Sequence, residues 1–227
     1  MEMDTVGKVK AEFYRLVGTL PDDGALVENS EAQDDVAYLY LTRGSRAAQR
    51  WMLKMGYGGW RKRSAALTWS GTDAADGGRY ATLPTDFLRA CGSQRQSALR
   101  EANGDGWGQE IIVYDEQLEG DGYYFRGDTL WLARTAAPPT TLYLDYHYTH
   151  PAWSASVTID FPMDARALIV AEAADAAKAE NWLPGDQAME VKIGRALAQA
   201  REEARDVARP SRQPRQFKKA PRWGNRW

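Results

Sequence analysis

The spacing of hydrophobic residues changes twice along this chain, and this change constrains the fold more than any other feature. Near the N-terminus the apolar residues recur every three or four positions, which predicts two amphipathic helices over roughly residues 5–20 and 30–56. Between residues 61 and 160 they alternate and glycines cluster, as is typical of strands. From residue 161 to 208 the helical spacing returns.

We therefore expect an α+β fold: a four-helix bundle with an inserted antiparallel β-meander and an extended C-terminal tail. Helices one and two of the bundle would occupy residues 1–60, and helices three and four residues 161–208. The strand-rich insertion would span residues 61–160, and residues 209–227 would form the tail.

Residues at the expected helix ends support this organisation. Ser30 begins a capping-box pattern, and Gly56 favours a left-handed stop after the second helix. The alanine-rich run from Ala165 to Ala179 predicts a third helix that packs closely against its neighbours. Asp186 is expected to cap the fourth helix, which Pro210 would end.

The clearest strand lies near the end of the insertion. Its hydrophobic pattern alternates and predicts two different faces. The buried face would carry Leu142, Leu144, Tyr146 and Tyr148, and the solvent-exposed face Tyr143, Asp145 and His147. Upstream, residues 122–134 predict a hairpin with its turn at Gly127 and Asp128. A prolyl loop would then return the chain to the strand at Leu142 and complete the meander.

Few residues have the arrangement that enzyme chemistry or metal binding needs. His147 and His150 are three apart, which on a strand places them on opposite faces. The single Cys91 cannot form an internal disulfide and has no basic neighbour in sequence that would activate it. No segment has the length and apolarity of a membrane span. We expect no enzymatic activity, no cofactor, no metal and no membrane association.

Charge divides the chain into an acidic body and a basic tail. The whole chain has a formal net charge of −2, to which residues 209–227 contribute +7 and residues 1–208 contribute −9. Prolines break the tail, and Phe217, Trp223 and Trp227 are residues of the type that anchors extended peptides in protein grooves. The tail therefore predicts a binding arm.

A nucleic acid is the alternative partner. The tail and the basic stretch from Tyr57 to Arg63 would follow the phosphate backbone, while Trp60, Trp223 and Trp227 would stack on bases. Because a dedicated DNA-binding protein usually has a basic face on its folded domain, the acidic body favours a protein partner.

Three stretches together resemble the head-to-tail adaptor (connector) proteins of tailed bacteriophages: "YATLPTDFLRACG", "YYFRGDTLWLARTAAPPTTLYLDYHYTHPAW" and "DFPMDARALIVAEAADAAKAEN". The resemblance covers roughly residues 80–181 and depends on the order of the motifs: Leu-Pro-x-Asp-Phe, a hairpin ending in Leu-x-Leu, a prolyl loop, a tyrosine-rich strand and an alanine-rich helix.

This resemblance implies a structural virion protein, made in the host bacterial cytoplasm and located at the head-tail junction. It would form a homo-oligomeric ring, dodecameric in most relatives, below the portal protein. The ring would extend the DNA channel, help retain the genome and dock downstream tail proteins, while genomic DNA passes through without sequence-specific binding.

The resemblance implies a role for the tail, and the general use of surface loops for binding suggests a role for a second set of residues. The portal-binding arm would consist of Arg209, Arg212, Arg215, Phe217, Lys218, Lys219, Arg222, Trp223, Arg226 and Trp227. The polar segment 95–108 departs from the family pattern, and its candidate contacts to a tail protein are Arg95, Arg100, Asn103, Asp105 and Trp107.

Overall fold

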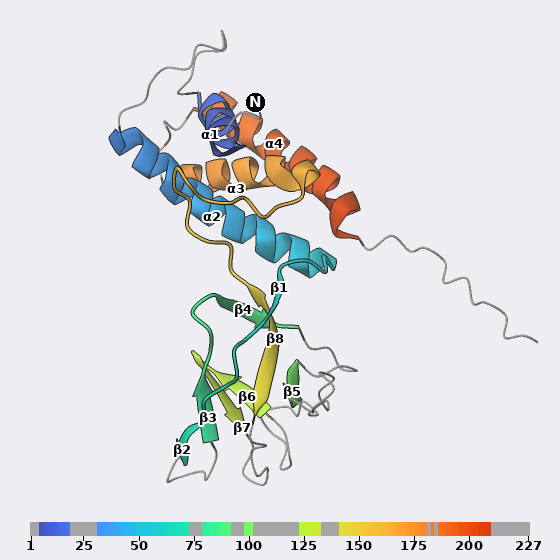
Figure 1. The fold of residues 1–227 in the computed structure, drawn as a ribbon. Helices are drawn as coiled ribbons and strands as arrows, with labels where there is room; N and C mark the ends of the chain where they lie inside the picture. Colours follow the sequence, from blue (N-terminus) through green and yellow to red (C-terminus); the bar gives the residue numbers. More distant parts are fainter. Residues whose placement is uncertain are drawn as a thin grey trace, which may run out of the picture.

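The computed structural model describes residues 5–18, 31–72, 79–91, 98–101, 123–132, 141–180, 183 and 186–209. Within these ranges the chain forms four α-helices and two antiparallel sheets, so the predicted α+β class is confirmed. The helices gather at one end of the molecule and the strands at the other (Figure 1). We refer to these two ends as the helical part and the β part.

The helical part is formed by both ends of the described chain. Its elements are α1 (Thr5–Leu16), α2 (Glu31–Met55), a short 3-10 helix η1 (Met163–Ala165), α3 (Arg166–Ala179) and α4 (Gln187–Ala208). Helices α2, α3 and α4 agree with the sequence prediction. Over the described residues, none of the helices combines the length and the apolar character that crossing a lipid bilayer would need.

Glycines end the first two helices. The first helix is shorter than the predicted range of 5–20, because Gly18 has a φ of 74° and donates its N–H to the Arg15 carbonyl oxygen. Gly56, with a φ of 102°, ends α2 as predicted. The N–H groups of Gly56 and Tyr57 donate to the carbonyl oxygens of Leu53 and Met52, which is the Schellman pattern. Ser30, the predicted cap of α2, lies outside the described residues.

Helix α3 is the centre of the helical part and packs against α1, α2 and α4. Its small side chains allow a close approach, as the alanine-rich sequence predicts. At Gly44 of α2 there is no room for a side chain, since an added Cβ would lie 2.5 Å from the Ile169 carbonyl oxygen and 2.6 Å from the Ala173 nitrogen. The one buried acid of α3, Glu172, accepts two hydrogen bonds from Arg201 of α4, at 3.1 and 2.8 Å.

The β part contains two antiparallel sheets. In the first, β8 (Leu142–Tyr148) is central and pairs with β1 (Arg61–Arg63), β4 (Phe87–Ala90) and β5 (Leu99–Glu101). The second has the order β2-β3-β7-β6, with β2 at Ser70–Thr72, β3 at Arg79–Thr82, β6 at Tyr123–Arg126 and β7 at Thr129–Leu132. A single core between them holds Leu99, Leu130, Leu132, Leu142 and Leu144.

The predicted meander is confirmed only for its first hairpin. Strands β6 and β7 pair antiparallel across Gly127 and Asp128, and Gly127 has the positive φ of 60° that a tight hairpin turn requires. Strand β8 does not join this hairpin, because β7 pairs with β3 and β8 lies in the other sheet. Hydrophobic alternation indicates which residues a strand buries but not which strand it pairs with, and this is why the prediction failed here.

The alternation of β8 is confirmed in part: Tyr148, predicted to be buried, is half-buried, and so are Tyr143 and Asp145 on the face predicted to be exposed to solvent. Leu142, Leu144 and Tyr146 are buried as predicted. His147 is also buried, although it points to the face that was predicted to be wet. Its Nδ1 lies 2.9 Å from the carbonyl oxygen of Gly59, in the segment that follows α2 and covers this end of the sheet.

Buried hydrogen bonds join the two parts. The side-chain amide of Gln49 on α2 donates to the Tyr148 carbonyl oxygen at 2.7 Å and accepts from the His150 N–H at 3.0 Å. Trp60 packs between Tyr57 and Phe161 at ring-centroid distances of 4.6 and 4.7 Å. The chain thus leaves α2, forms the β part and returns through a packed junction to α3.

Candidate functional site

Most residues of the predicted binding arm lie outside the described part of the chain. Arg209 is described: it is exposed and follows α4 as its C-cap, with its N–H donating to the Arg205 carbonyl oxygen at 3.0 Å. Its extended backbone is the conformation favoured before proline. The other arm residues, from Arg212 onward, lie outside the described part of the chain. The portal-binding role therefore stays a prediction.

Of the residues predicted to contact a tail protein, Arg100 is the one that the structure describes. This residue lies in β5, where its Nε donates to Asp145 Oδ2 at 2.9 Å. Arg63 donates to the same carboxylate, at 2.7 Å to Oδ1. Burial would raise the pKa of Asp145, but the two guanidinium groups outweigh it and hold the pKa below its usual value. Arg95, Asn103, Asp105 and Trp107 lie outside the described residues.

The structure corrects the prediction that Trp60 stacks on nucleic-acid bases. Only 5% of Trp60 is exposed, and its Nε1 donates to the Asp160 carbonyl oxygen. Its φ of 54° is unusual for a bulky residue, and the surrounding aromatic packing fixes it. The other two tryptophans named for stacking, Trp223 and Trp227, lie outside the described residues.

Both histidines are buried, and their pKa values lie below the usual range. Burial is the main cause in each case, opposed by a backbone hydrogen bond to Gly59 for His147 and to Pro151 for His150. Both rings are therefore neutral at physiological pH. Across the described ranges, no three His, Cys, Asp or Glu side chains come together in a group that could hold a metal ion.

One face of the β8 sheet is rich in arginine. Arg61 of β1 and Arg89 of β4 both pair in register with His147, so the three side chains form one row across the sheet. In the next row Arg63 pairs with Asp145, whose carboxylate also binds Arg100. Among the residues that the structure describes, four arginines therefore share this face with one acid, Asp145.

A polar cleft of roughly 440 Å³ lies where the first of these rows meets the end of α2. It is lined by Gly56, Tyr57, Arg61, Arg89, Ala90, Cys91 and His147. Arg89 extends to α2 and donates to the Leu53 carbonyl oxygen at 3.3 Å, a favourable position for a cation at a helix C-terminus. Among the described residues Arg61 has no ion-pair partner, so its charge is available to a ligand.

Cys91 lies close to two cations, Arg61 and Arg89. The charges of Arg61 and Arg89 lower its pKa, but burial raises it more, and the net direction is upward. The thiol therefore stays protonated at physiological pH. The prediction of no basic partner was wrong, because Arg89 lies only two residues before Cys91 and strand pairing brings Arg61 of β1 close as well.

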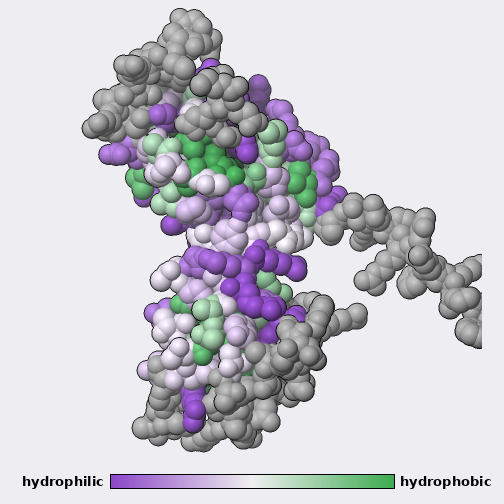
Figure 2. Space-filling model, viewed as in Figure 1, coloured by the Kyte–Doolittle hydropathy of each residue, from purple (hydrophilic) through white to green (hydrophobic). Residues whose placement is uncertain are grey.

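A stripe of cations on α2 leads to this cleft. Arg43, Arg46, Arg50 and Lys54 are three or four residues apart and all exposed, so they occupy one side of the helix. Arg43 pairs with Glu180 at the far end of the stripe. The other three have no ion-pair partner in the described part of the chain. Figure 2 shows hydrophilic residues gathered at the junction where this stripe ends.

The sequence contains a signal for this surface. From Val36 to Thr72 there are seven Lys or Arg residues and no Asp or Glu, as many cations as in the tail. The net charge of −9 on residues 1–208 does not reveal this run, because acids elsewhere in the body outnumber its cations. We call the surface formed by Arg46, Arg50, Lys54, Arg61 and Arg89 the cationic face.

The Leu-Pro-x-Asp-Phe motif has a clear structural role. Asp86 accepts from Tyr146 Oη at 2.6 Å and from Lys62 Nζ at 2.8 Å. Its carbonyl oxygen accepts from the Thr149 N–H at 2.7 Å. Burial would raise the pKa of Asp86, but these hydrogen bonds and the Lys62 charge lower it overall. The motif therefore fastens the start of β4 to the end of β8.

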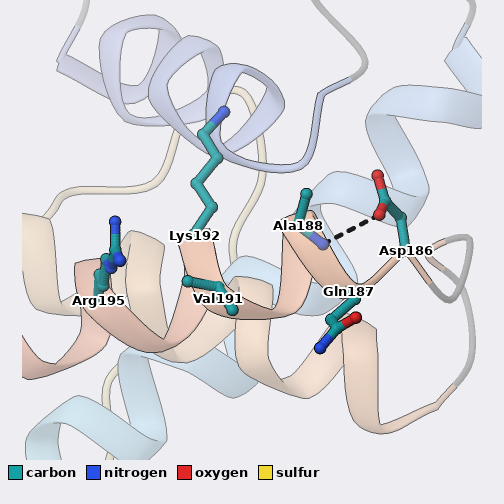
Figure 3. A pocket seen from close by; sticks show the side chains of 6 residues that line it. All are labelled: Asp186, Gln187, Ala188, Val191, Lys192 and Arg195. Carbon is teal, nitrogen blue, oxygen red and sulfur yellow. Dashed lines mark hydrogen bonds between the residues drawn. The ribbon is translucent and has the colours of Figure 1, made fainter.

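A second hollow, open and roughly 740 Å³ in volume, lies along the first turns of α4. Its lining residues are Asp186, Gln187, Ala188, Val191, Lys192 and Arg195. In Figure 3 Lys192 extends away from α4 toward α1, where it donates to the Arg15 carbonyl oxygen at 3.0 Å. Asp186 caps the helix as predicted, accepting from the Ala188 N–H at 2.9 Å. The lining side chains come from one helix and its cap, and they do not converge on a common point.

In comparisons with known proteins, no protein-family model matches this chain and no curated protein matches it either. The resemblance to phage adaptor proteins therefore depends on the motifs quoted from the sequence.

Proposed function

We propose that this protein is a structural head-to-tail adaptor of a tailed bacteriophage. Its copies would assemble as a homo-oligomeric ring, most simply a dodecamer, below the portal protein. The ring would extend the DNA channel, help retain the genome and dock downstream tail proteins. The helices would act as a four-helix bundle that forms the body of the ring.

The observation that carries this proposal is the position of the β part in the chain. It is inserted between α2 and α3, yet these two helices pack together more extensively than any other pair of elements. A helical part that closes without the insertion is suited to repeat around a ring, while the β part projects and presents loops to the next protein.

The motif geometry adds support. Asp86 of the Leu-Pro-x-Asp-Phe motif and Tyr146 of the tyrosine-rich strand are far apart in sequence and form a direct hydrogen bond. Two of the stretches that carry the resemblance therefore belong to one structural unit. Motifs that depend on one another in this way are less easily explained by chance similarity of separate segments.

The test is to mix the protein with the portal ring of the same virus and measure the size of the complex by light scattering after gel filtration. The intact chain should bind. A chain that ends at Arg209 keeps the described C-cap of α4 but lacks all other residues of the arm, from Arg212 to Trp227, and it should not bind. Failure of the intact chain to bind would overturn the proposal.

A matched pair of variants separates the two interpretations of the arm. Replacing Phe217, Trp223 and Trp227 by Ala should abolish portal binding, because aromatic anchors usually dominate such contacts. Replacing Lys218, Lys219 and Arg222 by Gln should weaken it less at physiological salt. The reverse result, together with DNA binding by the intact chain that is lost in the chain ending at Arg209, would favour the alternative of an accessory DNA-binding protein that uses this tail.

A further inference from the structure

We propose that the cationic face binds the phosphate backbone of duplex DNA without reading its sequence. This goes beyond the adaptor proposal and does not depend on it, because the surface belongs to the folded body and not to the arm. The argument uses charge, spacing and the composition of the surface.

The unpaired charges come first. Arg46, Arg50 and Lys54 are exposed and have no ion-pair partner among the described residues, and the same holds for Arg61. Surface helices usually mix acids with bases, since pairs of opposite charge four residues apart stabilise them. Four neighbouring cations without such partners repel one another, so an anion that binds among them relieves this repulsion as well as forming new contacts.

The spacing fits a polymer of phosphates. Arg46, Arg50 and Lys54 follow one another at intervals of four residues, or about 6 Å along the helix axis. This is comparable to the separation of neighbouring phosphates along one strand. At the end of α2, next to Lys54, the Leu53 carbonyl oxygen accepts from Arg89, which lines the cleft together with Arg61. A single small anion would use only part of this row, whereas a nucleic-acid backbone would use all of it.

The composition argues against a protein partner and against single-stranded nucleic acid. Protein interfaces have an apolar centre, but the large exposed hydrophobic residues Met163 and Val191 lie on η1 and α4, and Leu39 lies one turn beyond the end of the stripe. Binding of single strands uses aromatic platforms, and Trp60 is buried while Tyr57 packs against it. Arginine and lysine without stacking residues suit the backbone of a duplex.

The test measures binding of a short fluorescent DNA duplex by anisotropy between about 50 and 200 mM salt. The full chain and the chain ending at Arg209 should both bind, and affinity should fall steeply with salt. In the truncated background, Arg46→Gln, Arg50→Gln and Lys54→Gln together should reduce the slope of log affinity against log salt by roughly 2 to 3, since each phosphate contact contributes about 0.9.

The matched control removes the same charge elsewhere. Lys8→Gln, Arg195→Gln and Arg205→Gln together replace three exposed cations on α1 and α4 and should leave the slope unchanged. Glutamine is a good helix former, so both triple variants should fold. Arg61→Glu, at an exposed strand position, is a second variant that should weaken binding even if a triple variant proves unstable.

Three results would overturn the inference. The first is no binding by the full chain at the lowest salt. The second is an equal change of slope in the two triple variants, which would indicate a response to net charge alone. The third is complete loss of binding in the chain ending at Arg209, which would place the DNA contact in the arm. Portal binding is measured separately, so failure of the adaptor proposal would not decide this one.

Discussion

Gly44 is the residue at which the helical part is most sensitive to a single added carbon. The nearest atoms to a Cβ at this position belong to the backbone and Cβ of α3, at 2.5, 2.6 and 2.7 Å. None of them can rotate away, so a side chain would push two helices apart. The sequence predicted close packing from the alanines of α3, but it did not identify Gly44 as the partner.

We predict that Gly44→Ala destabilises the protein, although alanine is the better helix former by about 1 kcal/mol. The cost of overpacking is typically about 1–3 kcal/mol and should exceed that gain. The matched control is Gly194→Ala in α4, where an added Cβ meets nothing within 4 Å, and it should stabilise by about 0.4–1 kcal/mol. Urea unfolding of the two variants measures the difference. Equal stabilisation by both would contradict the close contact between α2 and α3.

Residues far apart in sequence explain why several side chains were misjudged. His147 was expected to be wet because its neighbours alternate, but Gly59 covers it from a segment almost ninety residues away. Cys91 was expected to lack basic neighbours, yet Arg61 and Arg89 affect its pKa. For His147 the missing information was the segment after α2 that covers this end of the sheet. For Cys91 the pairing of β1 with β8 brings Arg61 close, whereas Arg89 lies only two residues away and was a local signal that the sequence prediction overlooked.

At the scale of elements, helices were predicted better than strands because their signals are local. Spacing, caps and stops located α2, α3 and α4, whereas β1 has the sequence Arg-Lys-Arg and no hydrophobic alternation. It is a strand because β8 offers it hydrogen bonds, and its exposed charges suit an edge position. The cationic face was missed for a related reason, since its members lie on three elements.

The cap of α4 allows a test of one local signal. Asp186→Ala should destabilise the protein by about 1 kcal/mol, because the Ala188 N–H loses its acceptor and the helix dipole loses a favourable charge. Asp206→Ala, near the other end of the same helix, removes an exposed acid and should be neutral or slightly stabilising. Thermal unfolding compares them. Equal effects would show that net charge, and not capping, determines the result.

At the scale of the whole molecule, net charge is a poor guide to the local field. Residues 1–208 carry −9, yet the run from Val36 to Thr72 carries +7 and supplies most of the cationic face. A polyanion responds to the charges within about 10 Å of it at ordinary ionic strength, not to the sum over the chain. The acidic average of the body favours a protein partner only if charge is spread evenly. Because it is not, this average does not exclude a DNA contact by the body.

The two parts of the molecule are coupled at the junction, and Gln49 is the centre of that coupling. It is fully buried, and its amide satisfies the Tyr148 carbonyl oxygen and the His150 N–H, where the chain leaves β8. A buried polar group that loses its partner costs about 1–3 kcal/mol. The helical part also has the larger buried core, so it should remain folded more readily than the β part when the coupling is lost.

We therefore predict that Gln49→Met, which preserves size and helix propensity, selectively loosens the β part. Hydrogen exchange followed by mass spectrometry should show faster exchange in β4 and β8, with little change in α3. Gln199→Met is the control, since Gln199 is exposed on α4 and bonds only to Glu203 within the described chain. If exchange in Gln49→Met rises equally in α3 and β8, the molecule unfolds as one unit and the junction does not divide it into two.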